Sequence, residues 1–104
     1  MKIISETVVF VWDKGNKDKN AKKHGVTNEE SEQAFTQGRK FFVRDEDHST
    51  DDDRFILWGE TMDNRLLSII FTIRSGNVRI ISARDMNKKE RRVYAEKIQK
   101  NTTI

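Results

Sequence analysis

The segment 66–73, with the sequence Leu-Leu-Ser-Ile-Ile-Phe-Thr-Ile, constrains the fold more than any other part of the chain. Six of its eight residues are apolar, and most are β-branched or aromatic. A run of this length and composition is typical of a strand that is covered on both faces. The sequence therefore predicts a sheet in which this segment is a central strand, with other elements packed above and below it.

Further β-branched and aromatic runs supply neighbours for this strand. Ser75-Gly76-Asn77 is typical of a tight hairpin turn, and Asp63-Asn64 mark a second turn before the central strand. We expect the first of these runs, residues 7–12, to join the sheet at an edge. The predicted strands are residues 7–12, 41–43, 54–59, 65–74 and 78–83.

Helix signals lie on both sides of these strands. Asp13 can cap a helix over residues 14–24, and Gly25 provides a left-handed stop. Asn87 with Glu90 forms a capping signal for a last helix.

A second helix is predicted directly after Gly25. Thr27 with Glu30 has the spacing of a capping box, and Gly38 is its expected stop. Ala34 and Phe35 would face inward. Two helices, an antiparallel meander and a C-terminal packing helix together predict an α+β domain.

The composition limits the classes that the chain can belong to. Its 104 residues, 35% hydrophobic and 36% charged, fit one small globular domain over residues 1–104. Without cysteine there is no disulfide framework or thiolate chemistry, and with two histidines no zinc site is expected. No segment has the pattern of a membrane span or secretory signal. We therefore expect a cytoplasmic protein without a cofactor.

Charge is segregated along the chain. Residues 79–100 carry eight basic side chains against three acidic ones, and residues 14–23 carry five lysines against one aspartate. Residues 45–53 oppose them, with six acidic side chains in nine positions. Such a chain can present a basic face to a polyanion while the acidic segment, which can equally be a plain solvated loop, stays outside.

Arginines concentrate where the last predicted strand passes into the last helix. Arg84 ends the strand, and Arg91 and Arg92 fall in the first turns of the helix. Their planar guanidinium groups suit phosphate, which accepts two parallel hydrogen bonds from one fork. The alternative is a solvated basic helix face with no ligand.

Short blocks along about nine tenths of the chain carry a resemblance to a known family. These blocks are residues 10–13, residues 20–26, Glu30 with Ala34-Phe35, residues 45–49, residues 53–55, residues 79–84 and residues 90–94. In these blocks, and in their order, the chain resembles the BrnT-type ribonuclease toxins of bacterial type II toxin–antitoxin modules.

The resemblance implies a RelE-like fold and RNA cleavage without a metal. It also implies an antitoxin whose other end binds operator DNA, of ribbon-helix-helix type, in a complex of two toxin and two antitoxin chains. Two further readings stay open: a non-catalytic RNA-binding module, and an interaction protein whose basic groove holds an acidic partner.

Metal-free cleavage needs a base for the 2′-hydroxyl, cations for the charge that grows on the phosphate, and an acid for the leaving oxygen. Arg54, Arg84 and Arg91 or Arg92 are the candidate cations. Arg54 could instead pair with its own acidic loop, and Arg84 with Asp85 or a carboxylate of the last helix. Residues 51–53 suit a solvated turn better than a magnesium site.

The two imidazoles are the candidate acid and base, since they titrate in the required range. His24 could instead only cap a helix C-terminus, and His48 could be a plain surface residue. Tyr94 is expected either to pack on the sheet or to use its hydroxyl on the RNA. Lys22, Lys23 and Lys88, with Arg92, are expected to contact the RNA backbone; Trp12, Trp58 and Phe71 are assigned to the core.

Overall fold

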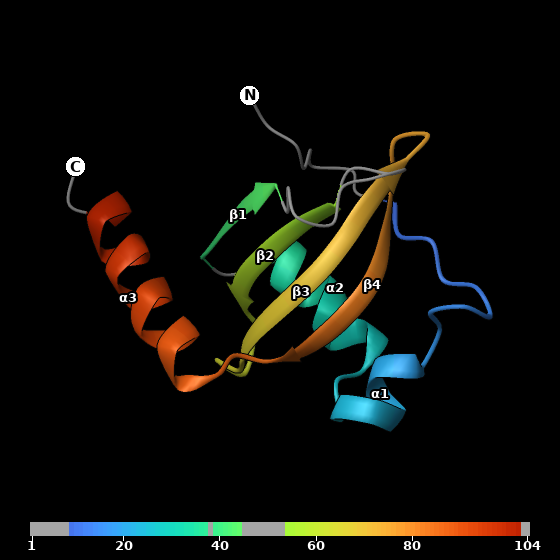
Figure 1. The fold of residues 1–104 in the computed structure, drawn as a ribbon, viewed down its shortest axis with the longest axis horizontal. Helices are drawn as coiled ribbons and strands as arrows, with labels where there is room; N and C mark the ends of the chain where they lie inside the picture. Colours follow the sequence, from blue (N-terminus) through green and yellow to red (C-terminus); the bar gives the residue numbers. More distant parts are fainter. Residues whose placement is uncertain (1–8, 38, 45–53, 103–104) are drawn as a thin grey trace.

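The computed structural model describes residues 9–37, 39–44 and 54–102. It contains two N-terminal helices, a four-stranded antiparallel meander in the order β1-β2-β3-β4, and a C-terminal helix (Figure 1). This confirms the predicted α+β class. The elements are α1 (Lys19–His24), α2 (Asn28–Thr36), β1 (Lys40–Arg44), β2 (Arg54–Glu60), β3 (Leu66–Arg74), β4 (Asn77–Asp85) and α3 (Lys88–Thr102).

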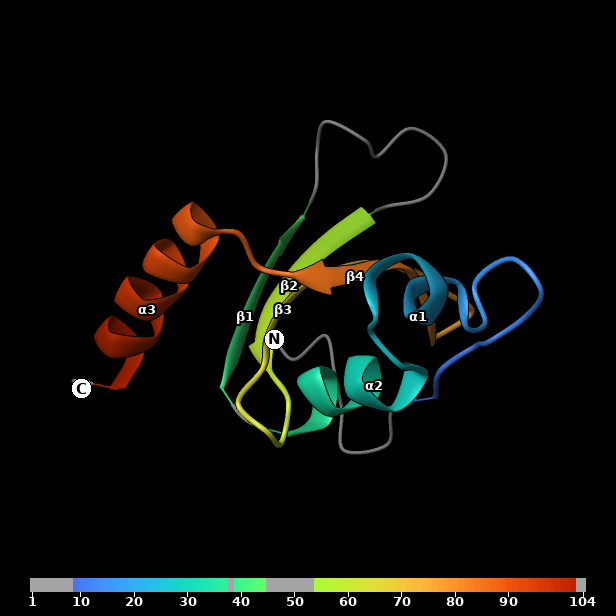
Figure 2. The same ribbon diagram turned by 90° about the horizontal axis from the view of Figure 1, so that it is seen from below.

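The helices α2 and α3 lie on opposite sides of the sheet (Figure 2). The main hydrophobic core lies between α2 and the sheet, with Ala34 and Phe35 facing inward as predicted. The residues of the sheet that complete this core are Leu57, Leu67, Ile69, Phe71, Val78, Ile80 and Ala83. A smaller cluster of Met86, Tyr94 and Ile98 fixes α3 to the other side.

β3 is a central strand, as its composition predicted. It pairs with β2 along one edge and with β4 along the other, and five of its nine residues are buried. The turn into β4 has Ser75 and Gly76 at φ 52° and 80°, the left-handed values that match a two-residue hairpin to the twist of its strands. Phe71 is fully buried, whereas Trp12 and Trp58 are half-buried at the margins of the two clusters.

Both predicted capping boxes are present. In α2, Thr27 Oγ1 accepts from the N–H of Glu30, and the Glu30 carboxylate accepts from the N–H of Thr27. In α3, Asn87 and Glu90 exchange the same pair of bonds at 2.8 and 2.9 Å. The expected stop of α2 at Gly38 lies outside the described residues.

The predicted helix over residues 14–24 is wrong in its first half, and only α1 forms. Residues 14–18 make a turn, because Asn16 turns inward and its amide donates to the carbonyls of Val11 and Ile80. Asp18 then adopts a left-handed conformation, φ 58°, which interrupts a helix. Asp13 caps this turn rather than a helix: its Oδ1 accepts from the N–H of Gly15.

The predicted strand over residues 7–12 is reduced, within its described part, to one parallel bridge between Phe10 and Val78. The bridge lies along β4, so the expected edge position is correct. The chain leaves the edge because its aromatic side chains turn toward α2. The ring of Phe10 packs on Phe35 at 5.3 Å, and Trp12 Nε1 donates to the carboxylate of Glu32 at 2.6 Å.

The strand register separates two ends of the sheet. Arg84 pairs with Ser68, which pairs with Trp58, near the end of the sheet where α3 begins. Arg54 pairs with Thr72, four residues further along β2 and β3. At about 3.3 Å per residue, the two ends are separated by roughly 13 Å along the strands.

Candidate nucleic-acid interface

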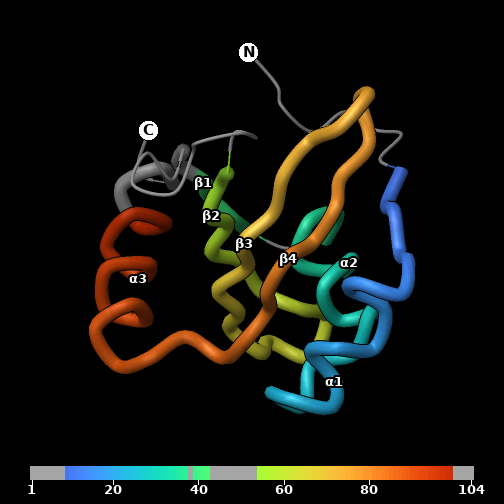
Figure 3. The backbone as a smooth tube through the Cα atoms, turned by 45° about the vertical axis from the view of Figure 1, so that its right-hand side comes forward, coloured from blue at the N-terminus to red at the C-terminus, as the bar shows by residue number. Residues whose placement is uncertain are grey.

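The passage from β4 into α3, residues 84–92, is called here the β4–α3 junction. β4 ends at Asp85, and the N–H of Met86 still bonds to the carbonyl of Leu66 at 3.0 Å. Met86 is buried, and the capping box of Asn87 and Glu90 starts the helix. The backbone of the junction is therefore fixed by the sheet on one side and by the helix cap on the other. Figure 3 shows the path of the backbone from β4 into α3.

Arg84 makes a bidentate ion pair within the junction. Its Nη1 and Nη2 donate to the two carboxylate oxygens of Glu90 at 2.8 and 2.9 Å, and Nη1 also donates to the carbonyl of Asp85. The hydrogen bond and charge of Arg84 lower the pKa of Glu90. The pairing with a carboxylate of the last helix, left open by the sequence, is thus what the structure shows. These three bonds use three of the five guanidinium N–H groups.

Arg91 lies beside Arg84 at the same junction. Its Nη1 donates to the carbonyl of Met86 at 2.7 Å, while Arg84 donates to the preceding carbonyl, that of Asp85. Since successive Cα atoms are about 3.8 Å apart, the two guanidinium groups lie on the order of 10 Å from each other or closer. Arg92 and Lys88, also in the first turns of α3, are exposed.

Arg65 connects the junction to the helical hairpin of α1 and α2. Its Nε and Nη2 donate to the carboxylate of Asp85 at 2.7 and 3.0 Å. Its Nη1 donates to the Glu30 carboxylate at 3.1 Å and to the carbonyl of Gly25 at 2.9 Å. The guanidinium group of Arg65, the residue directly before β3, therefore joins the end of β4, the end of α1 and the cap of α2.

This ion network keeps its carboxylates charged. The hydrogen bonds from Arg65 are the largest cause that lowers the pKa of Asp85, and the nearby charges of Arg91 and His24 act in the same direction. Burial alone would raise the pKa of Glu30, but hydrogen bonds from Thr27 and Arg65 outweigh it and lower that pKa. His24 is thereby placed close to Asp85, at the side of the junction that faces α1.

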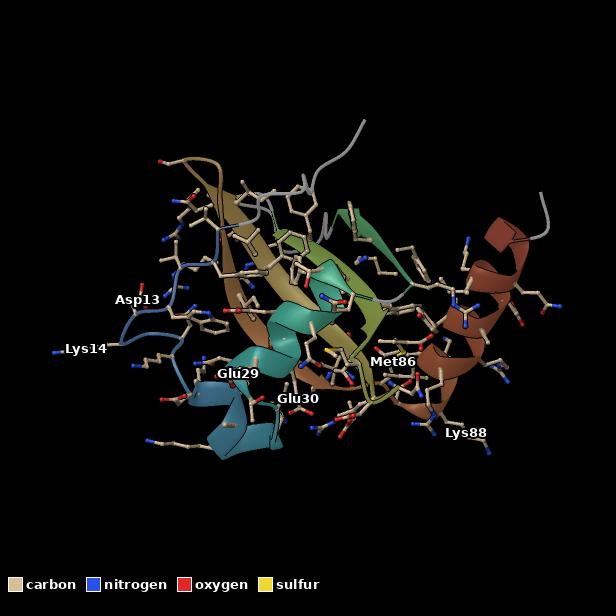
Figure 4. The ribbon with its side chains drawn as sticks, turned by 180° about the vertical axis from the view of Figure 1, so that it is seen from behind. Asp13, Lys14, Glu29, Glu30, Met86 and Lys88 are labelled. Atoms are coloured by element: carbon tan, nitrogen blue, oxygen red, sulfur yellow. The ribbon has the colours of Figure 1, made fainter. Side chains whose placement is uncertain are left out.

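The basic side chains of α1 lie beyond this network. Lys22 and Lys23 are exposed in the last turn of α1, and His24 is half-buried next to Gly25, whose φ of 69° is the left-handed stop that the sequence predicted. In Figure 4, Glu30 and Lys88 lie toward the same edge of the molecule. The structure therefore brings the α1 residues and the β4–α3 junction to one end of the sheet.

Two predicted site residues, Arg54 and Tyr94, do not join this group, and a third, His48, lies outside the described residues. Arg54 is half-buried at the opposite end of the sheet. Tyr94 is 3% exposed, and its hydroxyl bonds to the carbonyl of Arg39 at 2.6 Å and to the carboxylate of Glu60 at 3.0 Å. Burial and the Glu60 carboxylate raise the Tyr94 pKa well above its usual range. The structure thus favours the packing alternative for Tyr94.

Sequence reasoning missed Arg65 and Glu90 as parts of the site. The sequence predicts Arg65 only as the start of a strand, and Glu90 only as a helix-capping residue. Their spacing to the groups that they bind, 20 and 35 residues for Arg65, carries no local signal. The pairing of Arg84 with Glu90, six residues apart across a strand–helix junction, could be anticipated as one of several candidates.

In the part of the chain that the structure describes, no three His, Asp or Glu side chains gather in a way that could hold a metal ion. None of the described helices is both long and apolar enough to cross a membrane.

The fold and the junction define a small α+β protein whose fixed arginines suit a phosphate-containing polyanion. A family model described as ribonuclease toxin, BrnT, of type II toxin–antitoxin systems matches residues 12–90, and the chain belongs to this family. It is thus a ribonuclease toxin, with RNA as its substrate and a cognate antitoxin as its partner. No curated protein matches the chain at a significant level. The matched segment includes Arg84 and Glu90, and ends just before Arg91.

Proposed function

We propose that this toxin cleaves RNA without a metal ion, by attack of a ribose 2′-hydroxyl on the adjacent phosphate. The 2′-oxygen forms a bond to phosphorus, the 5′-oxygen of the next nucleotide leaves, and the products are a 2′,3′-cyclic phosphate and a 5′-hydroxyl. The proton of the 2′-hydroxyl passes to a base, and an acid supplies one to the leaving oxygen.

The placement of Arg84 and Arg91 at one rigid junction carries this proposal. Both side chains donate to successive backbone carbonyls, which limits the motion of their guanidinium groups. Cations held in place in this way stabilise the charge on a phosphorane without reorganisation, an effect of roughly 2–4 kcal/mol for one donor. Glu90 holds Arg84 in the absence of RNA, through the bidentate geometry that a phosphate would also accept.

The other candidates take roles that follow from their positions. His24, beside Asp85, is the proposed acid or base nearest the junction, and His48 is the second imidazole candidate. Lys22, Lys23, Lys88 and Arg92 are proposed to contact the RNA backbone on either side of the cleaved bond. Arg54, at the other end of the sheet, would meet the RNA at a distance from Arg84; the hydroxyl of Tyr94 is the weakest catalytic candidate.

We further propose that RNA cleavage inhibits translation and growth in the cytoplasm, and that the antitoxin prevents it by covering the junction. A basic surface is blocked most directly by a segment of complementary charge, which also speeds association. The antitoxin is proposed to be a ribbon-helix-helix protein that binds operator DNA, in a complex of two toxin and two antitoxin chains.

The proposal is tested by incubation of the purified toxin with RNA in excess EDTA. We expect cleavage to persist, with products that end in a 2′,3′-cyclic phosphate or 3′-phosphate, and no cleavage where the 2′-hydroxyl is replaced by hydrogen. The double variant Arg84→Ala/Arg91→Ala is expected to be inactive, whereas Arg74→Ala, an exposed arginine at the other end of β3, serves as the matched control. Strict dependence on magnesium, or RNA binding without any cleavage, would contradict the mechanism.

A further inference from the structure

A pocket of about 360 Å³ lies between α3 and the end of β2. Its aliphatic lining comes from Leu66, at the start of β3, and from Ala95 and Ile98 of α3. Arg39 and Arg91 add two guanidinium groups to the lining. The pocket thus adjoins the β4–α3 junction, because Arg91 belongs to both.

The wall of this pocket is fixed by the hydroxyl of Tyr94. That hydroxyl bonds to the Arg39 carbonyl and to the Glu60 carboxylate, and Arg39 Nη2 lies 3.6 Å from the same carboxylate. These contacts fix α3 relative to the end of β2, and Ala95, one turn or less away on α3, is exposed and lines the pocket. Arg39 is the most open of these groups, since 60% of its side chain is exposed.

We infer that this pocket anchors the antitoxin, by accepting one aliphatic side chain that is flanked by an acidic residue. The aliphatic side chain would lie on Leu66, Ala95 and Ile98, as in the binding of amphipathic segments to grooves. The acidic residue would pair with Arg39 or Arg91. These two positive charges outnumber the one negative charge of the pocket lining, that of Glu60. An antitoxin anchored here also covers Arg91, so the inference deepens the proposed inhibition by occlusion.

The lining favours a protein segment over RNA. Proteins that bind single-stranded RNA provide exposed aromatic rings on which unpaired bases stack. Here the aromatic ring nearest to the pocket, that of Tyr94, is buried to 3% exposure, and Glu60 places a carboxylate where a phosphate would be repelled. Three aliphatic side chains with cations beside them suit an aliphatic and an acidic side chain instead.

The inference is tested by filling the pocket. Ala95→Phe adds a large side chain at an exposed position, and Lys97→Phe is the matched control, because it lies about 200° further around the helix. The dissociation constant for the cognate antitoxin is measured for both variants, together with RNA cleavage. We expect Ala95→Phe to weaken antitoxin binding by roughly 30-fold or more, as for the centre of an interface, with Lys97→Phe changed by less than about threefold. RNA cleavage by Ala95→Phe should persist and should no longer be fully inhibited by the antitoxin.

A second variant tests the charged part of the pocket. Arg39→Gln keeps the backbone carbonyl that binds Tyr94 and should weaken antitoxin binding by about tenfold; it decides the question if Ala95→Phe does not fold. Unchanged antitoxin affinity in the folded variants would overturn the inference, as would a loss of RNA affinity alone, which would assign the pocket to RNA. If the wild-type toxin needs magnesium, the proposed mechanism fails, but the antitoxin measurement still decides this inference.

Discussion

The two sides of the sheet are packed in contrasting ways. On the α2 side, Phe71 contacts three other phenylalanine rings with centroids 4.8 to 6.4 Å apart, and the buried residues form one continuous core. On the α3 side, three buried residues fix the helix, and a pocket separates part of it from the sheet. At the start of α3, the ion pair of Arg84 with Glu90 provides contacts that apolar side chains provide on the α2 side.

This difference indicates how one small domain divides its tasks. The α2 side supplies the burial of apolar surface on which folding depends. The α3 side buries less apolar surface. It presents fixed cations and an open aliphatic pocket that partners can contact. Substitutions on the two sides should therefore separate loss of stability from loss of function.

The largest effect on stability is expected for Phe71→Ala. Removal of a fully buried ring from the core should lower the free energy of unfolding by about 3–5 kcal/mol, as measured by urea denaturation. Ile98→Ala, the comparison on the α3 side, should cost about 2 kcal/mol, because a helix with few contacts can move to fill the space. Equal losses for the two variants would contradict the contrast between the two sides.

Arg65→Ala should have an intermediate effect, about 1–2 kcal/mol at pH 7, because it leaves the half-buried carboxylate of Glu30 without its cation; the exposed carboxylate of Asp85 contributes less, since solvent screens it. The folded-state pKa of each carboxyl is lowered, so its contribution is present above the unfolded value, near 4, and is lost as the pH falls through the folded value. The stability difference between wild type and variant should therefore shrink below about pH 4. A difference that does not depend on pH would exclude the ion network as its cause.

Tyr94→Phe should cost about 1 kcal/mol of stability through the lost hydrogen bonds to Arg39 and Glu60. RNA cleavage should stay within about twofold of wild type, because this variant keeps the buried ring that holds α3. Cleavage assays at equal folded concentration provide the test. A large loss of activity in a stable Tyr94→Phe variant would indicate that the hydroxyl takes part in RNA cleavage.

The smallest effects are expected at Lys22 and Lys23. Each alanine variant should weaken RNA binding a fewfold at low salt, and should reduce the slope of log affinity against log salt concentration by about 0.7 to 0.9. The hairpin-end variant Arg74→Ala is the control with the same loss of charge. Identical salt slopes for the lysine variants and wild type would show that Lys22 and Lys23 do not contact the RNA backbone.

Much of this architecture could be predicted because its signals are local. The apolar run of β3, the Ser75-Gly76 turn and the two capping boxes each depend on residues within a few positions of one another. The turn at residues 14–18 could not be predicted, because the amide of Asn16 bonds to Ile80, 64 residues away. The prediction of a full strand over residues 7–12 was wrong for a similar reason, because its aromatic side chains contact α2, which is distant in the sequence.

The candidate site was predicted in part. Arg84 and Arg91 could be grouped because they lie seven residues apart on either side of one strand–helix junction. Arg54 was grouped with them from its strand-start position alone, and the register of β2 with β3 then placed it at the other end of the sheet. Arg65 gave no signal, because its three partners, Gly25, Glu30 and Asp85, come from three elements that only the fold brings together.

The most direct test of the account is the RNA cleavage rate of Arg84→Ala beside that of Arg74→Ala, in EDTA and on the same RNA. An oriented cation at the phosphate is worth roughly 2–4 kcal/mol, so Arg84→Ala should cleave about 30- to 1,000-fold more slowly than wild type when the two are compared at equal folded concentration. Arg74→Ala should cleave at nearly the wild-type rate. If the two variants cleave RNA at the same rate, the β4–α3 junction is not where this toxin stabilises the transition state.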